Sequence, residues 1–204
     1  MKFYLWWGWN PEWWDIAFNE QLSYITEILK KNNTKQLLHI PFARTGIRKR
    51  NRDAFSPNNL KSIITWLWIE YLDASYFEDI AAYNWDTIYI NWGNNCEFLF
   101  EMCNHSELLH AIKKSKNIIG ESCWAMIFWK NFENSKNIWQ VWFGFIENTI
   151  IIPHYTEHNM YESGIKGQEQ TWVSTILWID EATFIEYEEW KYWKTLGRWK
   201  TYIL

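Results

Sequence analysis

The stretch Asn117-Ile118-Ile119-Gly120-Glu121-Ser122-Cys123-Trp124-Ala125 decides the fold of this 204-residue chain. The apolar run over residues 117–121 predicts a buried β-strand, and the residues from Cys123 onward predict an apolar helix. Ser122 therefore lies at the sharp turn of a strand–turn–helix unit. Such units build α/β folds, in which a serine at the turn projects from the end of the sheet.

Strand and helix patterns alternate on the N-terminal side of this stretch. Leu22, Ile25 and Leu29 recur at helical spacing, so residues 12–32 are predicted to form an amphipathic helix. Ser56-Pro57 suits the cap and the first position of another helix. The alternation predicts an α/β fold with a mostly parallel, doubly wound sheet covered by helices on both faces. The predicted strands are Lys2–Trp7, Gln36–Phe42, Ile69–Leu72, Thr87–Asn91 and Asn117–Glu121, and further helical stretches are Leu60–Leu67, Tyr76–Tyr83 and Cys96–Lys114.

The pattern changes after Ala125. Residues 149–152 predict a short strand, residues 155–170 a loop followed by a helix, and residues 173–204 strands broken by turns. We therefore expect antiparallel strands at the C-terminal edge of the sheet. No linker rich in Pro, Gly or Ser and no repeat period divides the chain, so residues 1–204 are predicted to form one catalytic domain.

Composition argues against several classes of protein. The chain has 20 Lys and Arg against 24 Asp and Glu, so it lacks the excess of positive charge that phosphate binding needs, and nucleic acid is not an expected partner. No window of about 18 apolar residues is present, so neither a membrane span nor a signal peptide is expected. The three cysteines are an odd number without C-x-x-C spacing, which favours a reducing cytoplasm over a disulfide framework or a zinc knuckle.

Tryptophan and glycine occur in unusual, complementary numbers: the chain has 18 tryptophans and 8 glycines. Several tryptophans lie where turns favour glycine, because glycine reaches positive φ and has no side chain. Trp92 precedes Gly93, for example, and Trp124 follows Ser122 by two residues. We predict that UGA codons meaning glycine in the source genome have been read as tryptophan. The alternative is a Trp-rich binding module whose rings line one face, for stacking on sugars or for contact with a membrane surface.

With glycine at position 124, residues 120–124 form a G-x-S-x-G nucleophile elbow. Small residues two positions before and after the serine let the strand and the helix approach closely while Ser122 Oγ stands exposed. The N–H groups at the start of the helix point toward a developing oxyanion, so the N–H of Cys123 is one candidate donor. Gly93, in a segment that becomes N-G-G-N-N with glycine at position 92, is the candidate for the second donor.

A serine nucleophile needs a general base, and His154 is the favoured histidine. It follows the strand pattern of residues 150–153, at the level where α/β folds place their sites. His158 lies four residues later, but the pair lacks both the H-E-x-x-H pattern and a third ligand, so no metal site is predicted. His39 is predicted to be a core residue, and His105 and His110 are predicted to be surface residues.

The base needs a carboxylate that orients its imidazole. Glu181 follows the apolar run of residues 175–179, again at a strand end, and is the favoured carboxylate. Glu133, Asp180 and Glu157 remain alternatives.

A basic cluster follows the second predicted strand. It fits either a solvated loop or a contact with an anion or a substrate carboxylate. Arg44 from this cluster, together with Asn94 beside the candidate oxyanion donor, is predicted to bind substrate. The cluster consists of Arg44, Arg48, Lys49, Arg50 and Arg52.

Read with glycine for tryptophan, the chain resembles the peptidase E (alpha-aspartyl dipeptidase) family of serine peptidases, to which cyanophycinase is related. The matching segments occur in the family's order and cover nearly the whole chain. They are Tyr4-Leu5-Trp6-Trp7-Gly8, Ile40-Pro41-Phe42-Ala43, Asn91-Trp92-Gly93-Asn94, Gly120-Glu121-Ser122-Cys123-Trp124-Ala125, Pro153-His154-Tyr155 and Trp178-Ile179-Asp180-Glu181.

The resemblance implies a fold similar to the class I glutamine amidotransferases, Ser122 as nucleophile, His154 as base, and cytoplasmic cleavage of short peptides without a cofactor. The carboxylate varies within the family. The G-I-D-E segment of cyanophycinase-like members matches residues 178–181, which supports Glu181. We expect a serine peptidase that acts on dipeptides or short acidic peptides, as a monomer or homodimer, with neither nucleic acid nor membrane as a partner.

The chain departs from the family in two respects. Cys123 replaces the usual alanine, so an amidotransferase-like or stress-type relative that uses Cys123 is the alternative function. Aspartyl specificity also calls for a cation facing the substrate carboxylate, but no arginine follows His154 until Arg198. The candidates for that cation are Lys166, Arg44 and Arg48.

Overall fold

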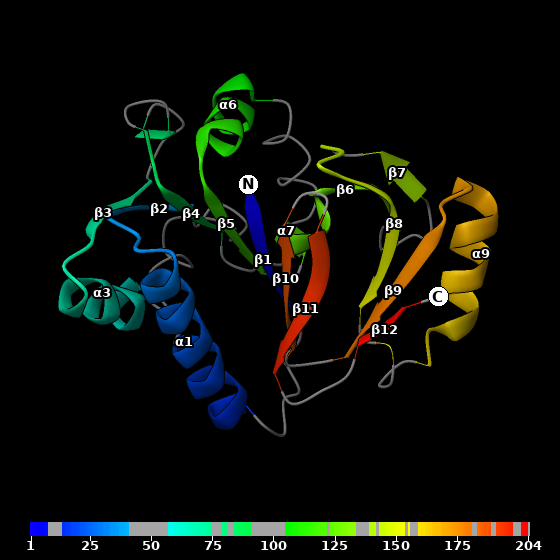
Figure 1. Ribbon diagram of the computed structural model, residues 1–204, viewed down its shortest axis with the longest axis horizontal. Helices are drawn as coiled ribbons and strands as arrows, with labels where there is room; N and C mark the ends of the chain where they lie inside the picture. Colours follow the sequence, from blue (N-terminus) through cyan, green and yellow to red (C-terminus); the bar gives the residue numbers. More distant parts are fainter. Residues whose placement is uncertain are drawn as a thin grey trace.

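A computed structural model of the chain describes residues 1–7, 14–40, 57–74, 79–80, 84–90, 105–121, 123–133, 139–141, 143–153, 155, 159–180, 183–188, 191–197 and 201–203. Within these residues the strands form two sheets; helices lie on both faces of the first sheet and on the outer face of the second (Figure 1). The strand order is β11-β10-β1-β5-β4-β2-β3 in the first sheet and β12-β9-β8-β6-β7 in the second.

The first sheet has a parallel part and an antiparallel edge. The five strands β1 to β5 run parallel to one another, and β10 and β11 continue the sheet antiparallel from β1. Parallel neighbours need crossover connections, which explains the helices between successive strands. The strands are β1 (Lys2–Trp7), β2 (Gln36–Ile40), β3 (Glu70–Asp73), β4 (Thr87–Ile90), β5 (Asn117–Glu121), β10 (Thr183–Glu188) and β11 (Lys191–Gly197), and the helices between them include α1 (Trp14–Lys31), α3 (Pro57–Trp66) and α6 (Ser106–Lys114).

The second sheet is built by the C-terminal half of the chain. Its strands β6, β8 and β9 run parallel, while β7 and β12 pair antiparallel at its two edges. The short helix α7 (Cys123–Met126) precedes this sheet, and α9 (Tyr161–Thr171) connects β8 to β9. The strands are β6 (Trp129–Glu133), β7 (Trp139–Val141), β8 (Ile146–Pro153), β9 (Thr175–Ile179) and β12 (Thr201–Ile203).

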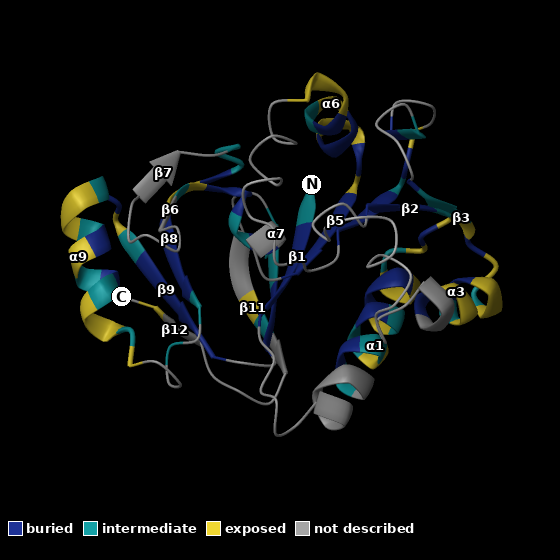
Figure 2. Cartoon of the chain, turned by 180° about the vertical axis from the view of Figure 1, so that it is seen from behind, coloured by how far each residue is buried: buried dark blue, intermediate teal, exposed yellow. Residues whose placement is uncertain are grey.

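Strand β1 shows how the two faces of the first sheet are used. Phe3, Leu5 and Trp7 point into a core that the first sheet shares with residues of the second sheet, while Tyr4 and Trp6 point into a core under α1 and α3. This division follows from the two-residue period of a strand. A third core lies between the second sheet and α9. Figure 2 shows the buried strands, with exposed residues on the outer sides of α3 and α9.

The predicted fold class is confirmed: the chain is an α/β protein with a mostly parallel sheet and antiparallel strands near its C-terminus. The second sheet is an addition that the sequence patterns did not predict. Residues 129–133 read Trp-Lys-Asn-Phe-Glu, which alternates too weakly to mark a strand. Parts of two predicted helices, 76–78, 81–83 and 96–104, lie outside the described residues. Among the helices that are described, none is long and apolar enough to cross a membrane.

Two tryptophans have a backbone conformation that rarely carries a large side chain. Trp68 has φ of 55° and Trp172, the residue that caps the C-terminus of α9, has φ of 56°. The other non-glycine residues with positive φ in the described part of the chain are asparagines, which tolerate this region better. Both tryptophans are 91% exposed, so no packing of the indoles offsets the strain.

Candidate active site

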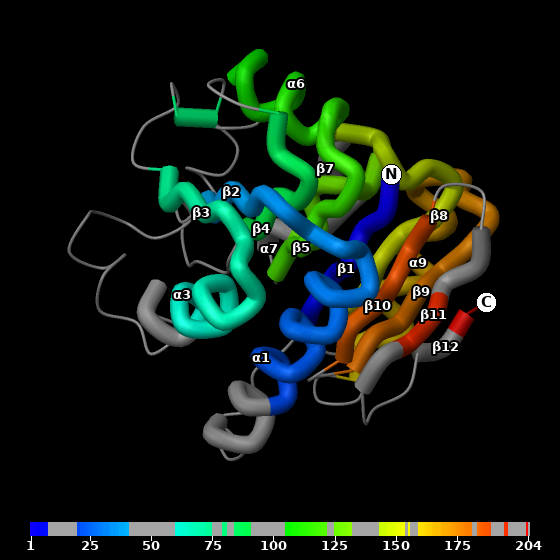
Figure 3. The backbone as a smooth tube through the Cα atoms, turned by 60° about the vertical axis from the view of Figure 1, so that its left-hand side comes forward, coloured from blue at the N-terminus to red at the C-terminus, as the bar shows by residue number. Residues whose placement is uncertain are grey.

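The carboxyl ends of the parallel strands in the first sheet meet at one edge, where α/β folds place their sites. Strand β5 ends at Glu121 and lies beside β1, with Trp6 and Glu121 as paired residues. Thr183, the first residue of β10, pairs with Trp7 on the other side of β1. Figure 3 shows β1 between β5 and β10. The edge is therefore formed by the end of β5, the end of β1 and the start of β10.

The strand–turn–helix unit is present at this edge. Strand β5 ends at Glu121 and α7 begins at Cys123, so a single residue separates the strand from the helix. Helix α7 contacts both β5 and β1. This arrangement agrees with the elbow pattern, although Ser122 itself and the side chain of Cys123 lie outside the described residues.

Gly120 lies where α7 and the chain after it press against β5. A Cβ on Gly120 would lie 3.0 Å from Phe128 Cε2 and 3.3 Å from Ala125 Cα. Because Ala125 contributes backbone at this point, the contact has little room to relax. The close approach is the one that the G-x-S-x-G spacing predicts at its first glycine.

The Gly120→Ala variant is therefore expected to lose about 1–3 kcal/mol of stability through overpacking. Thermal unfolding would measure the loss, with Lys113→Ala on the exposed side of α6 as a control that leaves the melting temperature unchanged. An unchanged melting temperature for Gly120→Ala would contradict the close packing of α7 on β5.

The second sheet brings the other candidate positions to one edge of its own. Pro153, the last residue of β8, pairs with Ile179, the last residue of β9. His154 comes directly after the first of these residues, and Asp180 and Glu181 come directly after the second. Strand β6, which ends at Glu133, runs parallel to β8 and ends at the same edge.

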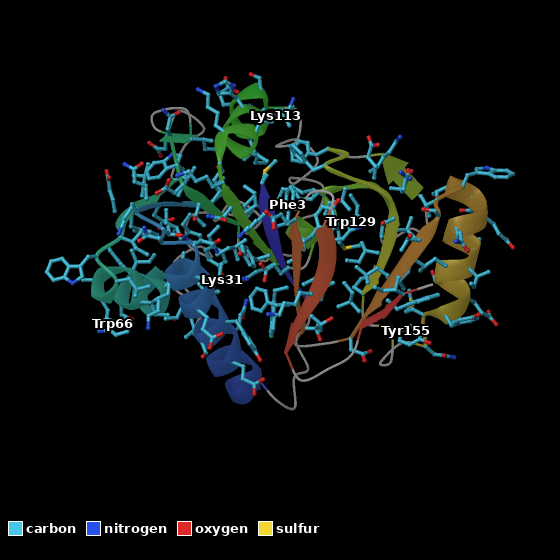
Figure 4. All side chains as sticks on the ribbon, in the orientation of Figure 1. Phe3, Lys31, Trp66, Lys113, Trp129 and Tyr155 are labelled. Atoms are coloured by element: carbon cyan, nitrogen blue, oxygen red, sulfur yellow. The ribbon has the colours of Figure 1, made fainter. Side chains whose placement is uncertain are left out.

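The two edges are joined by the chain itself. Four residue steps separate Ile179 at the end of β9 from Thr183 at the start of β10, which limits the distance between their Cα atoms to about 14 Å. Thr183 pairs with Trp7, and β1 in turn lies beside β5. The two sheets also share a core, in which the rings of Trp7 and Trp129 have centroids 5.6 Å apart. Figure 4 shows Trp129 and Phe3 in this region between the sheets.

A buried polar group that the sequence patterns did not single out lies directly before Ser122. Glu121 is only 1% exposed, and its Oε1 accepts hydrogen bonds from the hydroxyl of Tyr89 on β4 and from Nε2 of Gln21 on α1. The sequence feature that could have indicated this buried group is a glutamate at the end of an otherwise apolar strand. Such a residue is rarely buried unless other groups satisfy it.

His39 is a core residue, as predicted. Its Nδ1 lies 3.1 Å from the Tyr71 hydroxyl and 3.1 Å from Oδ1 of Asp73, while its buried Nε2 has no hydrogen-bond partner in the described part of the chain. Burial and the neighbouring Asp73 raise the pKa of Tyr71, so its hydroxyl stays protonated at neutral pH. His105 and His110 are exposed, also as predicted.

The predicted site residues are only partly described by the structure. Asp180 is buried, and Lys166 is exposed on α9. For Glu133 only the backbone is described. Among the described residues no cluster of His, Cys, Asp and Glu could hold a metal ion. The positions outside the described residues are Arg44, the rest of the basic cluster, Gly93, Asn94, Ser122, His154, Glu157, His158 and Glu181.

The chain is similar in fold to a peptidase from an acI-B1 Actinobacterium whose crystal structure is known. The TM-score is 0.68 at 22% sequence identity, and the match covers 100% of this chain and 90% of the other. No protein-family model matches the chain, and neither does any curated protein. The similarity therefore establishes the fold, which is one that a peptidase adopts.

Proposed function

We propose that the protein is a serine peptidase that hydrolyses dipeptides or short acidic peptides through Ser122, His154 and Glu181. The observation that carries the proposal is where three strands end: β5 ends one residue before Ser122, β8 one residue before His154, and β9 two residues before Glu181. The short connection from Ile179 to Thr183 brings the end of β9 toward the edge where β5 ends. The similarity in fold to a solved peptidase supports the same function.

The reaction would proceed through an acyl-enzyme. Ser122 Oγ attacks the peptide carbonyl while His154 takes its proton, and His154 then gives that proton to the leaving amine as the C–N bond breaks. A water molecule, deprotonated by His154, hydrolyses the resulting ester and regenerates Ser122. The N–H groups of Cys123 and Gly93 would stabilise the oxyanion, and loss of one such donor typically costs about 10²–10³ in rate. Arg44 and Asn94 are the proposed substrate-binding residues.

Glu181→Gln tests the choice of carboxylate. The amide favours the wrong tautomer of His154, so kcat is expected to fall by about 10⁴-fold while the fold is retained. Asp180→Asn is the matched control, because it makes the same change one residue away at a position that is buried at the end of β9. Steady-state kinetics on short acidic peptides would measure both variants. A large loss in Asp180→Asn with little change in Glu181→Gln would transfer the role to Asp180.

Within this proposal the chain is a member of the peptidase E family in which tryptophan stands for glycine. The positive φ at Trp68 and Trp172 supports the recoding, since glycine is the residue that most often ends a helix in this conformation. Further support comes from Trp6, Trp7 and Trp178, whose buried indole N–H groups have no hydrogen-bond partner among the residues that the structure describes. Buried Trp N–H groups usually find an acceptor.

Two alternatives make different demands on the structure. A nucleophilic Cys123 would require its thiol, and not the hydroxyl of Ser122, to reach the apex of the turn. A Trp-rich binding module would require most indoles to line one exposed surface. The described tryptophans do not favour the latter: Trp66 and Trp172 are exposed on α3 and after α9, at opposite sides of the molecule in Figure 1. Those that are buried include Trp6, Trp7, Trp85, Trp129 and Trp178.

A further inference from the structure

Glu121 is a carboxyl-bearing side chain almost completely removed from solvent, one position before the proposed nucleophile. Burial of such a group is costly unless hydrogen bonds satisfy it. Two neutral groups donate hydrogen bonds to its Oε1, the Tyr89 hydroxyl at 2.5 Å and the Gln21 amide. Apolar residues at this strand end would pack without that cost, so its presence calls for a role.

The two donors belong to different parts of the fold. Tyr89 lies on β4, the strand beside β5, while Gln21 lies on α1, which covers this face of the sheet. The Tyr89 ring is held in turn by His39, with ring centroids 5.1 Å apart and an interplanar angle of 20°. Glu121 therefore ties the end of β5 to a neighbouring strand and to a helix through groups that are themselves fixed.

The preceding residue holds the opposite face of the same strand. Gly120 lies against Ala125 and Phe128, on the side of α7, whereas Glu121 points toward α1 and Tyr89. Successive residues of a strand point to opposite faces, so the pair fastens the strand end from both sides. Glu121 is the last residue of β5, so the two residues that precede Ser122 in the chain are held by contacts on opposite faces of the strand.

We propose that Glu121 is a positioning residue that sets the geometry of the turn at Ser122 through its contacts with Tyr89 and Gln21. The proposal rests on the proposed function of Ser122. In this role the carboxylate of Glu121 acts through the backbone: it fixes the last residue of β5, and with it the direction in which the chain enters the turn that would carry the nucleophile. A misplacement of about 1 Å in such a group can cost about 10²-fold in rate.

The test compares Glu121→Gln and Tyr89→Phe with the parent protein, all produced with the codon assignment of the source genome. Glu70→Gln is the matched control, because Glu70 accepts a hydrogen bond from Gln36 in an exposed pair on β3 and β2. Four quantities are measured: the melting temperature, kcat and KM on short acidic peptides, and the rate at which a fluorophosphonate labels the protein. The labelling step forms a bond between Ser122 Oγ and phosphorus and releases fluoride, so it reports the nucleophile without any peptide.

In Glu121→Gln, kcat and the labelling rate are expected to fall together by about 10–10²-fold, with KM changed by no more than about twofold. Tyr89→Phe should lower kcat and the labelling rate by a smaller factor. Glu70→Gln should leave both unchanged. If Glu121→Gln does not fold, Tyr89→Phe alone decides the outcome.

Parent kinetics retained in both variants would overturn the positioning role while leaving the peptidase proposal intact. A lower melting temperature with unchanged kcat in the folded protein would overturn it as well, because it would show that Glu121 contributes to stability only. A parent protein that the fluorophosphonate never labels would instead overturn the proposed function, and the role of Glu121 with it.

Discussion

Ser122→Ala is expected to abolish peptide hydrolysis while the protein still folds. One hydroxyl would carry the covalent step, and removal of a nucleophile that works with a base typically costs on the order of 10⁵-fold or more in kcat. The substitution removes a single oxygen atom at a turn, so the melting temperature should change little. Hydrolysis of short acidic peptides and labelling by a fluorophosphonate would measure the loss.

Cys123→Ala is the control for Ser122→Ala, because it removes the other candidate nucleophile. Residue 123 would contribute mainly its backbone N–H, which alanine retains, so the variant should keep most of the parent activity. Comparison of Ser122→Ala with Cys123→Ala therefore distinguishes the hydroxyl from the thiol as the nucleophile. An inactive Cys123→Ala beside an active Ser122→Ala would assign the reaction to the thiol and overturn the serine mechanism.

The largest effect on stability is expected from restoring glycine at all 18 tryptophan positions. A side chain held at positive φ costs about 1–3 kcal/mol, and overpacking costs about 1–3 kcal/mol at each core site. Over even a few of the 18 positions these costs rival the 5–15 kcal/mol that stabilises a typical domain. The restored protein should therefore melt at a higher temperature and hydrolyse peptides faster. Restoration at positions 92 and 124 alone should reopen the site without recovering stability.

Two exposed positions provide a sharper version of this experiment. Trp68→Gly and Trp172→Gly should each raise the melting temperature, because both residues have positive φ and are 91% exposed. Trp66→Gly is the matched control: Trp66 is 64% exposed at the end of α3, where φ is negative, and Lys30 Nζ lies 4.3 Å from its ring centroid. Trp66→Gly should not raise the melting temperature.

The codons provide an independent check of the recoding. UGA is expected at most of the 18 tryptophan positions. A majority of UGG codons would refute the recoding. So would a protein with tryptophan at every position that melts cooperatively and hydrolyses peptides as fast as the restored form.

Local patterns predicted the elements of the first sheet closely. The apolar run at residues 117–121 became β5 with the same bounds, and the helix predicted for residues 12–32 is α1 (Trp14–Lys31). The start of α3 at Pro57 agrees with the Ser-Pro signal. These features depend on residues close together in the chain, so periodicity and capping were sufficient to find them.

The elbow was predictable in part. The end of β5 at Glu121 and the start of α7 at Cys123 agree with the strand–turn–helix reading, and the packing of Gly120 explains its first glycine. The roles of Ser122, His154 and Glu181 remain predictions. Glu121 was missed as a polar centre because its partners, Gln21 and Tyr89, lie 100 and 32 residues away in the sequence.

By itself the sequence determined the strands and helices of the first sheet up to β5, the α/β class, and the turn that would carry a nucleophile. These properties follow from side-chain periodicity and turn chemistry, which act over a few residues. Only the tertiary structure decided that β6 to β9 and β12 form a second sheet, while β10 and β11 return to the first. Strand partners are chosen by burial of faces that are distant in the sequence, here the core shared by Leu5 and Leu177. That same long-range packing buries Glu121 beside Tyr89 and brings the end of β9 toward the end of β5.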